Sequence, residues 1–296
     1  MCCQTPYNSG SPGPAIMLSY RHAFHAGNHA DCLKHFVLVC LLRHLAQKDK
    51  PFWMIDTHAG AGAYGLDSGY ATKNEEWQGG IARLWERTDL PPALADYVEL
   101  VRAMNPPGRL TFYPGSPYLA AKLLRDQDRL RLYELHPTDV DLLGKTFMDA
   151  GRKVMVTLGD GFAGLKSQLP PQPRRALVLI DPSYEDKHDY VAVLTALRDS
   201  VKRFPTGTYA VWYPQLPRPE ALRLPERLRG VAVDWLDVRL SICRPGSAGF
   251  GMSGSGMFIV NPPWTLAATL RECLPVLKSA LAVDEGAEFR IETSSE

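Results

Sequence analysis

The residues best suited to chemistry are Asp181, Pro182, Ser183 and Tyr184, which follow the uncharged run of residues 176–180. Such a run is typical of a strand that is buried on both faces of a parallel sheet. Pro182 should end this strand, because proline cannot donate a hydrogen bond to a sheet ladder. Asp181 is therefore expected at the carboxyl end of a central strand, where open α/β sheets bind their ligands.

These side chains suit methylation of an exocyclic amino group on a planar base. The lone pair of such an amine is delocalised into the ring, so the nitrogen needs an acceptor for its N–H, which Asp181 can supply. Backbone carbonyls of the Pro182-Ser183 turn can accept the second N–H, and Tyr184 can stack on a base that has left its helix. On its own, however, this motif more often marks an ordinary turn, with Asp181 as a turn residue and Tyr184 as part of the packing.

Four strands of one parallel sheet are expected, and an acidic residue follows each of them. The strands are residues 51–56, 129–133, 153–158 and 176–180, with Asp56, Glu134, Asp160 and Asp181 at their ends. In a parallel sheet these ends share one edge. An acid after the second strand can accept from both ribose hydroxyls of a nucleoside cofactor, and an acid after the third can accept from an adenine amino group. This order predicts an α/β fold, namely a Rossmann-like class I methyltransferase that uses S-adenosylmethionine, with a mostly parallel central sheet.

The turn after the first strand contains small residues, including Gly60 and Gly62, which let a ligand approach the backbone closely. It lacks the Gly-x-Gly-x-x-Gly pattern of nicotinamide-dependent dehydrogenases, which makes a dehydrogenase a weaker alternative. The pattern Asp-x-His-x-Gly-x-Gly is closer to the first motif of S-adenosylmethionine-dependent methyltransferases, with His58 where a glycine is usual.

Two helix starts carry polar residues that could bind a ligand. Asn28 is expected to cap a helix that runs to about residue 47, and Ser116 to cap a helix that begins with Pro117. Four histidines lie near the first helix start: His22, His25, His29 and His35. Their spacings do not match a common zinc module, so no metal is predicted. Polar residues gathered at a helix start fit an anion or cofactor site better.

The chain is expected to fold as one methyltransferase domain over residues 17–296, preceded by a disordered extension over residues 1–16. A doubly wound fold needs only a short connection after its first strand. Residues 66–113 are therefore expected to form an inserted helical subdomain. This insertion either helps to hold the substrate or is purely structural.

Composition sets limits on partners and location. The 296 residues carry a net charge of +1, so any nucleic-acid contact must come from local basic patches such as residues 218–229. The six cysteines contain no C-x-x-C pair, which indicates a reduced, cytoplasmic protein. No apolar run is long enough to span a membrane and no signal-peptide pattern opens the chain, so no membrane partner is expected.

A second motif competes for the catalytic role. By its letters, the run Asn261-Pro262-Pro263-Trp264 is a better amino-methylation motif than the run that begins at Asp181. It follows the seventh strand-like segment, however, which is expected to be antiparallel and to end beyond the pocket. The turn at Asp181 is therefore preferred.

Several motifs together resemble the bacterial 23S ribosomal RNA adenine-N6 methyltransferase family of the RlmJ type. The match runs from Met17 to at least Trp264, and Ser183 stands where the family usually has a second proline. The matching segments are residues 20–35, 56–62, 113–117, 134–137, 160–162, 179–182, 212–214 and 261–264.

The resemblance implies a monomeric enzyme that transfers a methyl group from S-adenosylmethionine to one adenine of 23S RNA, in protein-free or early precursor form. It implies that Asp181 accepts the amino proton and that Tyr20 gates the site or touches the substrate. The implied or expected cofactor contacts are Lys34, His35, His58, Gly60, Ser116, Glu134, Asp160, Gly161 and Asp181. A DNA adenine-N6 methyltransferase and a non-catalytic RNA-binding assembly factor remain as alternatives.

Overall fold

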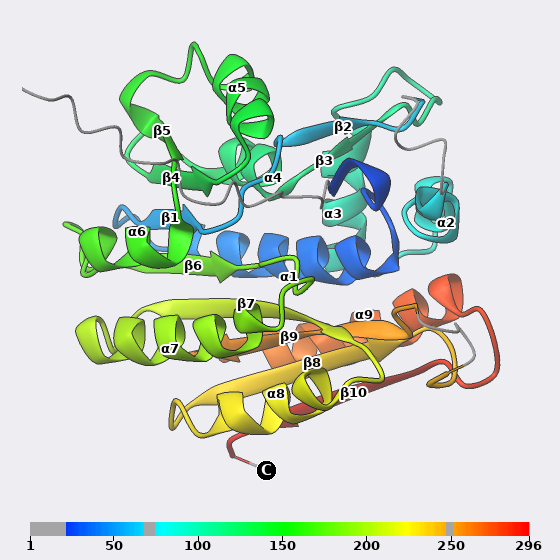
Figure 1. Cartoon of the computed structure of the whole chain (residues 1–296). Helices are drawn as coiled ribbons and strands as arrows, with labels where there is room; N and C mark the ends of the chain where they lie inside the picture. The colour runs from blue at the N-terminus through cyan, green and yellow to red at the C-terminus, as the bar shows by residue number, and fades with distance from the viewer. Residues whose placement is uncertain (1–21, 68–74, 247–250, 296) are drawn as a thin grey trace, which may run out of the picture.

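An eight-stranded sheet forms the centre of the computed structural model, which describes residues 22–67, 75–246 and 251–295 (Figure 1). Residues 1–16 and Tyr20, for which the sequence predicts a disordered extension and a gating role, lie outside the described residues. In spatial order the strands are β10 (Glu288–Thr293), β8 (Trp235–Ser241), β9 (Gly254–Val260), β7 (Thr208–Gln215), β6 (Ala176–Ile180), β1 (Trp53–Asp56), β4 (Arg129–Glu134) and β5 (Val154–Leu158).

The sheet has the strand order and directions of a class I methyltransferase. Strands β5, β4, β1, β6 and β7 are parallel, whereas β9 runs antiparallel to both β7 and β8. The antiparallel β10 extends the sheet beyond β8. The chain leaves β1 toward β4 on one side and later returns to β6 on the other, so a topological switch point, where such sheets bind ligands, lies at the carboxyl ends of β1 and β6.

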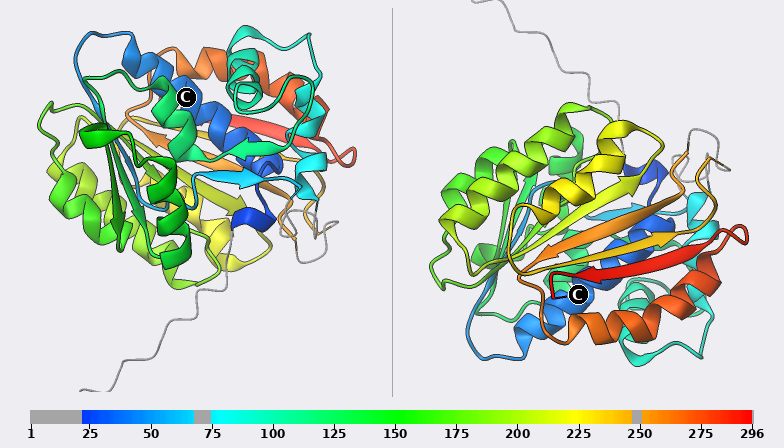
Figure 2. Two further views of the ribbon diagram at one scale, coloured as in Figure 1. Left: turned by 90° about the horizontal axis from the view of Figure 1, so that it is seen from above. Right: turned by 90° about the horizontal axis from the view of Figure 1, so that it is seen from below.

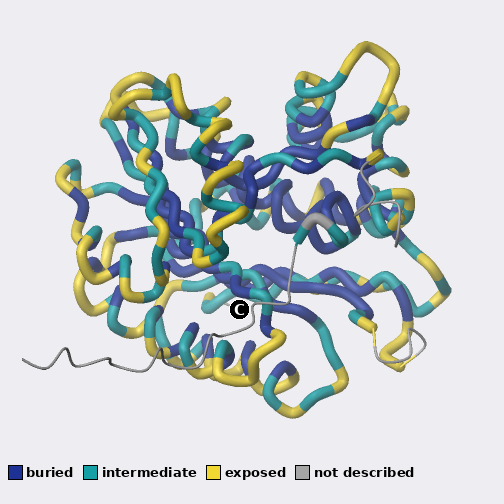
Figure 3. The backbone as a smooth tube through the Cα atoms, turned by 45° about the horizontal axis from the view of Figure 1, so that its top comes forward, coloured by how far each residue is buried: buried dark blue, intermediate teal, exposed yellow. Residues whose placement is uncertain are grey.

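Helices cover both faces of the sheet, which explains why every residue of β6 is buried. The core on one face includes residues of α1 (His29–Ala46), α4 (Ser116–Leu123), α5 (Pro137–Thr146) and α9 (Leu266–Leu281). The core on the other face includes residues of α6 (Gly161–Gln168), α7 (His188–Arg203) and α8 (Pro219–Arg229). Figure 2, right, shows α7 and α8 covering one face of the sheet, and Figure 3 shows the buried backbone gathered at the centre of the molecule.

Helix α1 begins where the sequence predicts. The Asn28 side chain caps it by accepting from the backbone N–H groups of Ala30 and Asp31, which confirms the expected N-cap. Most residues of α1 are buried, including Leu33 and Phe36 with no exposed surface. The helix is therefore a central core element, and its first turn is held rigidly at the edge of the sheet.

The described residues of the stretch 66–113, which are 66–67 and 75–113, include the helical segments η3 (Glu76–Gly79), α2 (Ala82–Trp85) and α3 (Pro92–Arg102). The strands β2 (Ala63–Gly65) and β3 (Phe112–Pro114) pair antiparallel and bring its two ends together. Buried residues of α3, among them Tyr97 and Val101, belong to the same core as α1 and α9. The inserted helices are therefore continuous with the main domain.

The 3-10 turns η1 (His22–Phe24) and η4 (Gly151–Lys153) lie elsewhere in the described chain, before α1 and before β5.

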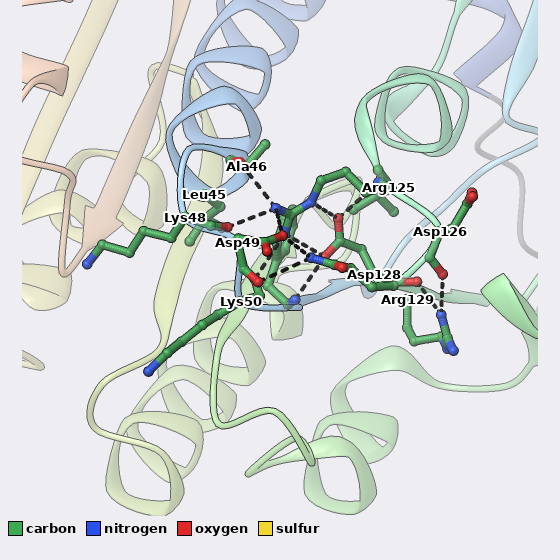
Figure 4. Close-up of polar contacts among 12 residues, drawn as sticks. Leu45, Ala46, Lys48, Asp49, Lys50, Arg125, Asp126, Asp128 and Arg129 are labelled. Atoms are coloured by element: carbon green, nitrogen blue, oxygen red, sulfur yellow. Dashed lines mark hydrogen bonds and ion pairs between the residues drawn. The ribbon is translucent and has the colours of Figure 1, made fainter.

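An ion-paired cluster closes the amino-terminal edge of the sheet (Figure 4). The Arg125 side chain donates to the Asp128 carboxylate at 2.9 Å and to the backbone carbonyls of Lys48 and Lys50 at 2.8 and 2.9 Å. Asp128 is fully buried and also accepts from the backbone N–H of Phe52. Burial alone would raise the pKa of Asp128, but these hydrogen bonds and the Arg125 charge lower it. The cluster joins the loop after α1 to the start of β4.

Candidate active site

A cavity of about 630 Å³ lies at the carboxyl-terminal edge of the sheet, where the topology places a ligand. Its walls come from the first turns of α1 and α4, the turn after β1, the end of β4 and the turn after β6. Of the residues expected from the sequence, Lys34, His35, His58, Gly60, Ser116, Glu134, Asp181, Pro182 and Ser183 line it. The volume falls in the range of ligand pockets, about 300–1,000 Å³.

Lys34 joins two carboxylates at one end of this cavity. Its Nζ lies 2.6 Å from Oδ2 of Asp181 and 2.9 Å from Oδ1 of Asp31, and only 5% of its side chain is exposed. Nε2 of His22 lies 2.9 Å from the other oxygen of Asp31. Lys34 therefore orients Asp181, a task that the sequence does not suggest because the two residues lie 147 positions apart.

Burial and charge oppose each other in this cluster. Burial raises the pKa of Asp181, although the adjacent Lys34 charge acts in the opposite direction. Burial alone would lower the pKa of Lys34, but Asp181 and Asp31 outweigh it and raise the pKa, so Lys34 stays protonated. Burial would likewise raise the pKa of Asp31, yet His22 and Lys34 hold it well below its usual range. The result is a carboxylate at Asp181 that is desolvated, fixed in position and readier to accept a proton than a carboxylate in water.

Tyr184 does not line the cavity, and the prediction that it stacks on a substrate base is wrong. Its backbone has a φ of 55°, and its N–H donates to Asp189. This conformation turns the ring into the core on the α7 side, where 1% of the residue is exposed and the ring packs against Tyr190 and Trp212. The Tyr184 hydroxyl donates to the carbonyl of Trp212 at 2.7 Å.

Trp212 supplies the aromatic surface that the sequence assigned to Tyr184. It lies in β7, next to β6, and lines the cavity together with Asp181. Nζ of Lys34 lies 5.7 Å from the centroid of its ring. The sequence could have indicated Trp212 by its position. It lies in the strand beside β6, one residue after Val211, just as Asp181 lies one residue after Ile180, the partner of Val211.

Ser116 and Asp56 connect the first strand to α4. Ser116 is the first residue of α4 and Gly115 occupies the N-cap position, so the predicted capping role of Ser116 is wrong by one residue. The Ser116 hydroxyl instead donates to Oδ2 of Asp56 at 2.6 Å. Asp56 has no exposed surface, and burial raises its pKa to about 7. A buried carboxyl group with a pKa near 7, hydrogen-bonded to Ser116 in the cavity wall, is typical of a functional site.

Glu134 presents a carboxylate to the cavity from the end of β4. It accepts from the backbone N–H groups of Gly60 and His136, both at 2.8 Å, which fixes its orientation. Burial raises its pKa, and these two hydrogen bonds act in the opposite direction. Gly60 has a φ of 60°, and a Cβ there would lie 2.2 Å from the Tyr64 hydroxyl, so glycine is required. The carboxylate can accept from the ribose hydroxyls of a nucleoside cofactor, and this contact stays a prediction.

Asp160 and Gly161 do not line the cavity in this structure. Asp160 is exposed and caps α6, with its side chain accepting from the backbone N–H of Phe162 at 2.9 Å. Gly161 is buried against the turn after β1, where a Cβ would lie 2.0 Å from the carbonyl oxygen of Thr57. Both residues thus have structural reasons for their identity, and their contact with a cofactor stays a prediction.

Two histidines that line the cavity, His35 and His58, are neutral near neutral pH. Burial lowers the pKa of His58 to about 4 and that of His35 to about 3. Nδ1 of His35 lies 2.7 Å from the Tyr113 hydroxyl. These rings can therefore exchange hydrogen bonds with a ligand, but they bring no positive charge to it.

A nucleoside-like cofactor fits the polar groups that remain. Nε2 of His29 and Nδ1 of His136 are buried and have no hydrogen-bond partner, and both residues line the cavity. Buried polar atoms normally find partners, so these atoms indicate a polar ligand. Within residues 22–67, 75–246 and 251–295, no group of three His, Cys, Asp or Glu residues is arranged to hold a metal ion. Across the same residues, no helix is both long and apolar enough to cross a bilayer.

The competing motif at Asn261 lies at the opposite edge of the sheet. Because β9 is antiparallel to β7, Val260 pairs with Tyr209 near the start of β7. The Asn261 side chain donates to the carbonyls of Pro205 and Gly207 at 2.7 and 2.6 Å. This turn lies away from the cavity, as expected from the antiparallel strand before it, and the catalytic role of Asp181 stays a prediction.

The strand order, the cavity at the switch point and the carboxylates around it define a class I methyltransferase that uses S-adenosylmethionine. A family model described as "Ribosomal RNA large subunit methyltransferase D, RlmJ" matches residues 49–292, and the chain belongs to this family.

Similar proteins agree with this assignment. The chain is 46% identical over 278 residues to a "Ribosomal RNA large subunit methyltransferase J" of Haemophilus influenzae, covering 93% of this chain and 98% of the relative. It is 48% identical over 266 residues to the protein with the same name in Escherichia coli, covering 90% and 94%. A crystal structure of a Legionella pneumophila protein superposes with a TM-score of 0.86 at 36% identity, covering 92% of this chain and 99% of that chain.

Proposed function

We propose that the protein transfers a methyl group from S-adenosylmethionine to the exocyclic N6 of one adenine in 23S ribosomal RNA. We further propose that it acts as a monomer in the cytoplasm, on protein-free or early precursor RNA. The observation that carries the proposal is the Asp181 carboxylate, which lines the cavity at the end of β6 and is held there by Lys34 at 2.6 Å. The names of the relatives at 46% and 48% identity support ribosomal RNA as the substrate.

Asp181 would act on the amino group of the bound adenine. Its carboxylate accepts one N–H, which orients the nitrogen lone pair, and the raised pKa of Asp181 favours uptake of the proton during or after transfer. Pro182 and Ser183 also line the cavity, and a backbone carbonyl of this turn can accept the second N–H. Trp212, in the same wall, offers the face on which the adenine can stack.

Lys34 would hold Asp181 in place rather than take part in proton transfer. Because its pKa is raised, it stays a cation and keeps the carboxylate ionised until the proton arrives. Such a fixed pair places the acceptor before the substrate binds, and positioning of this kind contributes much of the rate in transfer reactions.

S-adenosylmethionine supplies the methyl group as an electrophile on a sulfonium. Glu134 would bind its ribose hydroxyls, and His29, His136 and Ser116 offer hydrogen-bonding groups along the same wall. Asp160 and Gly161 would bind its adenine, in keeping with the order of the strand ends.

The test is methyl transfer to purified nucleic acids. Protein-free 23S RNA transcribed in vitro and a DNA duplex of the same sequence are incubated with the protein and labelled S-adenosylmethionine, and the nucleosides are identified by mass spectrometry. We expect N6-methyladenosine at one position of the RNA and no label in the DNA. Label in the DNA would point to a DNA methyltransferase. Binding of RNA with no label in either, and no binding of S-adenosylmethionine by calorimetry, would point to an assembly factor.

The same nucleoside map applied to ribosomal RNA from a strain that lacks the gene identifies the adenine in the cell. One N6-methyladenosine should disappear from 23S RNA and return when the gene is restored. An unchanged map would contradict the proposal.

A further inference from the structure

A second cavity of about 230 Å³ adjoins the active-site cavity on the side of β8 and β10. Pro214 and Leu216, which follow Trp212 along the chain, line both cavities and so form a common wall. The second cavity is smaller than a typical pocket for a whole ligand, about 300–1,000 Å³. It is therefore suited to one part of a substrate whose main part lies in the first cavity.

One side of the second cavity is apolar and the other carries hydrogen-bonding groups. Leu222 and Pro225 of α8 contribute to the apolar side. On the polar side the Ser241 hydroxyl donates to Oε1 of Gln215 at 2.7 Å, and Ser253 lies beside them. Apolar surface opposite polar groups is what a nucleobase needs, because its faces are apolar and its edges form hydrogen bonds.

Two arginines share the wall formed by β8 and β10. Arg239 and Arg290 are directly opposite each other in the antiparallel register, and both line the cavity. Like charges directly opposite each other destabilise a sheet unless an anion compensates them. Asp237 holds the Arg239 guanidinium at 2.5 Å, whereas Nη1 of Arg290 lies 3.6 Å from Glu292 and its side chain is 59% exposed. Arg290 can therefore contact a phosphate at the mouth of the cavity.

The outer face of α8 extends this basic character. Arg223 and Arg227 are exposed on it, and Leu222, which lines the cavity, is 71% exposed. Exposed arginines beside an apolar cleft are typical of surfaces that follow a nucleic-acid backbone.

We propose that the second cavity binds the nucleotide next to the target adenine in the RNA strand. This inference rests on the proposed function. When the target adenine occupies the first cavity, the adjoining nucleotide of the strand must lie just outside it. The second cavity is adjacent, since Pro214 and Leu216 border both cavities. There the base lies against α8 and Arg290 contacts its phosphate. The second cavity thus makes the enzyme selective for the sequence beside the adenine.

Charge reversal at Arg290 tests the proposal, with a matched reversal as its control. Arg290→Glu removes the phosphate contact at the cavity. Arg152→Glu makes the same change at an exposed arginine in η4, beside β5 at the other end of the sheet. For Arg290→Glu we expect the KM for 23S RNA to rise about tenfold, with kcat and the Kd for S-adenosylmethionine unchanged. Arg152→Glu should change none of these values by more than about twofold.

The milder variant Arg290→Ala gives an independent readout. Loss of one phosphate contact should lower the slope of log affinity against log salt concentration by about one, and Arg152→Ala should leave the slope unchanged. Thermal melting of all four variants shows that they fold.

A photocrosslink locates the nucleotide itself. A short RNA around the modified adenine carries 4-thiouridine at the position before or after it, and the crosslinked peptide is identified by mass spectrometry. Crosslinks to residues 214–225 from one of the two positions are expected.

Equal changes in KM for the two charge reversals, or crosslinks only outside the second cavity, would overturn this inference while the proposed function stands. Failure of the wild-type protein to methylate 23S RNA would instead overturn the proposed function, and with it the choice of this ligand.

Discussion

Asp128 at one edge of the sheet and Asp56 and Asp181 at the other have pKa values shifted in opposite directions. At the amino-terminal edge, Asp128 is bound by Arg125 and two backbone N–H groups, and its pKa is lowered. At the carboxyl-terminal edge, burial raises the pKa values of Asp56 and Asp181, even though each has a hydrogen-bond partner. The residue type is the same, and neither Asp128 nor Asp56 has any exposed surface.

The difference lies in how completely each carboxylate is satisfied. Asp128 accepts hydrogen bonds on both oxygens from groups that belong to the fold, so it stabilises the native state and has no capacity left. At the other edge, Asp181 lines the cavity and is held by Lys34 through Oδ2, which leaves Oδ1 to accept a hydrogen bond from a ligand. A buried acid with a raised pKa beside a cavity therefore indicates function more reliably than burial alone.

The largest expected effect is on catalysis at Asp181. Asp181→Asn keeps the shape of the side chain but removes its ability to take up a proton. The rate of methyl transfer should fall by roughly 10²- to 10⁴-fold, while the Kd for S-adenosylmethionine changes little. Single-turnover assays and calorimetry measure the two effects, and near-wild-type turnover would refute the assignment of Asp181.

Removal of Lys34 should affect both stability and the pH dependence of the rate. Lys34→Gln leaves two buried carboxylates without their cation, which should lower the free energy of unfolding by about 3 to 5 kcal/mol. Without the Lys34 charge the pKa of Asp181 rises further, so its ionised form, and with it the rate, should appear only at higher pH. An unshifted pH–rate profile in a folded Lys34→Gln protein would show that Lys34 does not act through Asp181.

Asp128 offers the matching test at the other edge. Asp128→Asn should lower the free energy of unfolding by about 2 kcal/mol, because a charged hydrogen-bond acceptor is lost. Transfer rates measured well below the melting temperature should not change. A decrease in rate comparable to that of Asp181→Asn would break the distinction between the two edges.

The contributions of Asp56 and Asp128 to the free energy of unfolding should also depend on pH in opposite directions. Asp56 has a pKa raised to about 7, so its contribution is full at acid pH and is lost as the pH rises from about 4 to about 7. The pKa of Asp128 is lowered, so its contribution is present above the usual aspartate pKa and is lost as the pH falls through the lowered value. Denaturant unfolding across pH should show that Asp56→Asn removes the decrease toward neutral pH and that Asp128→Asn removes the decrease in acid. The reverse pattern would contradict the assignment.

The smallest expected effect concerns Tyr184. Tyr184→Phe removes the hydrogen bond to the Trp212 carbonyl, which should lower the free energy of unfolding by about 1 kcal/mol. The KM for RNA should stay the same, because the ring does not line the cavity. A large rise in KM without a loss of stability would restore the stacking role.

Much of the fold was predictable because local patterns and the sheet topology agree. The expected strand over residues 176–180 is β6, since a uniformly apolar run can be satisfied only between two covered faces. The Asn28 cap was equally local, because its hydrogen bonds reach only two and three residues ahead. The placement of the four strand-end acids at one edge of the sheet followed from the parallel direction of the strands. Asp160, however, caps α6 from an exposed position.

The side-chain partners at the site could not be predicted in the same way. Tyr184 stood in a motif that suggested stacking, but its left-handed backbone conformation turned the ring into the core. Lys34 lies near the start of a helix, where the sequence suggested cofactor binding. In the structure it pairs with the carboxylate of Asp181, which is distant in the sequence.

The sequence by itself predicted the parallel strands, the shared edge at which their acidic residues lie and the turn that begins at Asp181, since periodicity, proline and helix capping act over a few neighbouring residues. Only the tertiary structure decided which aromatic ring lines the cavity, which cation holds Asp181 and that a second cavity adjoins the first. These features depend on packing between α1, β6, β7 and α8, segments that meet only when the apolar faces of the sheet are buried.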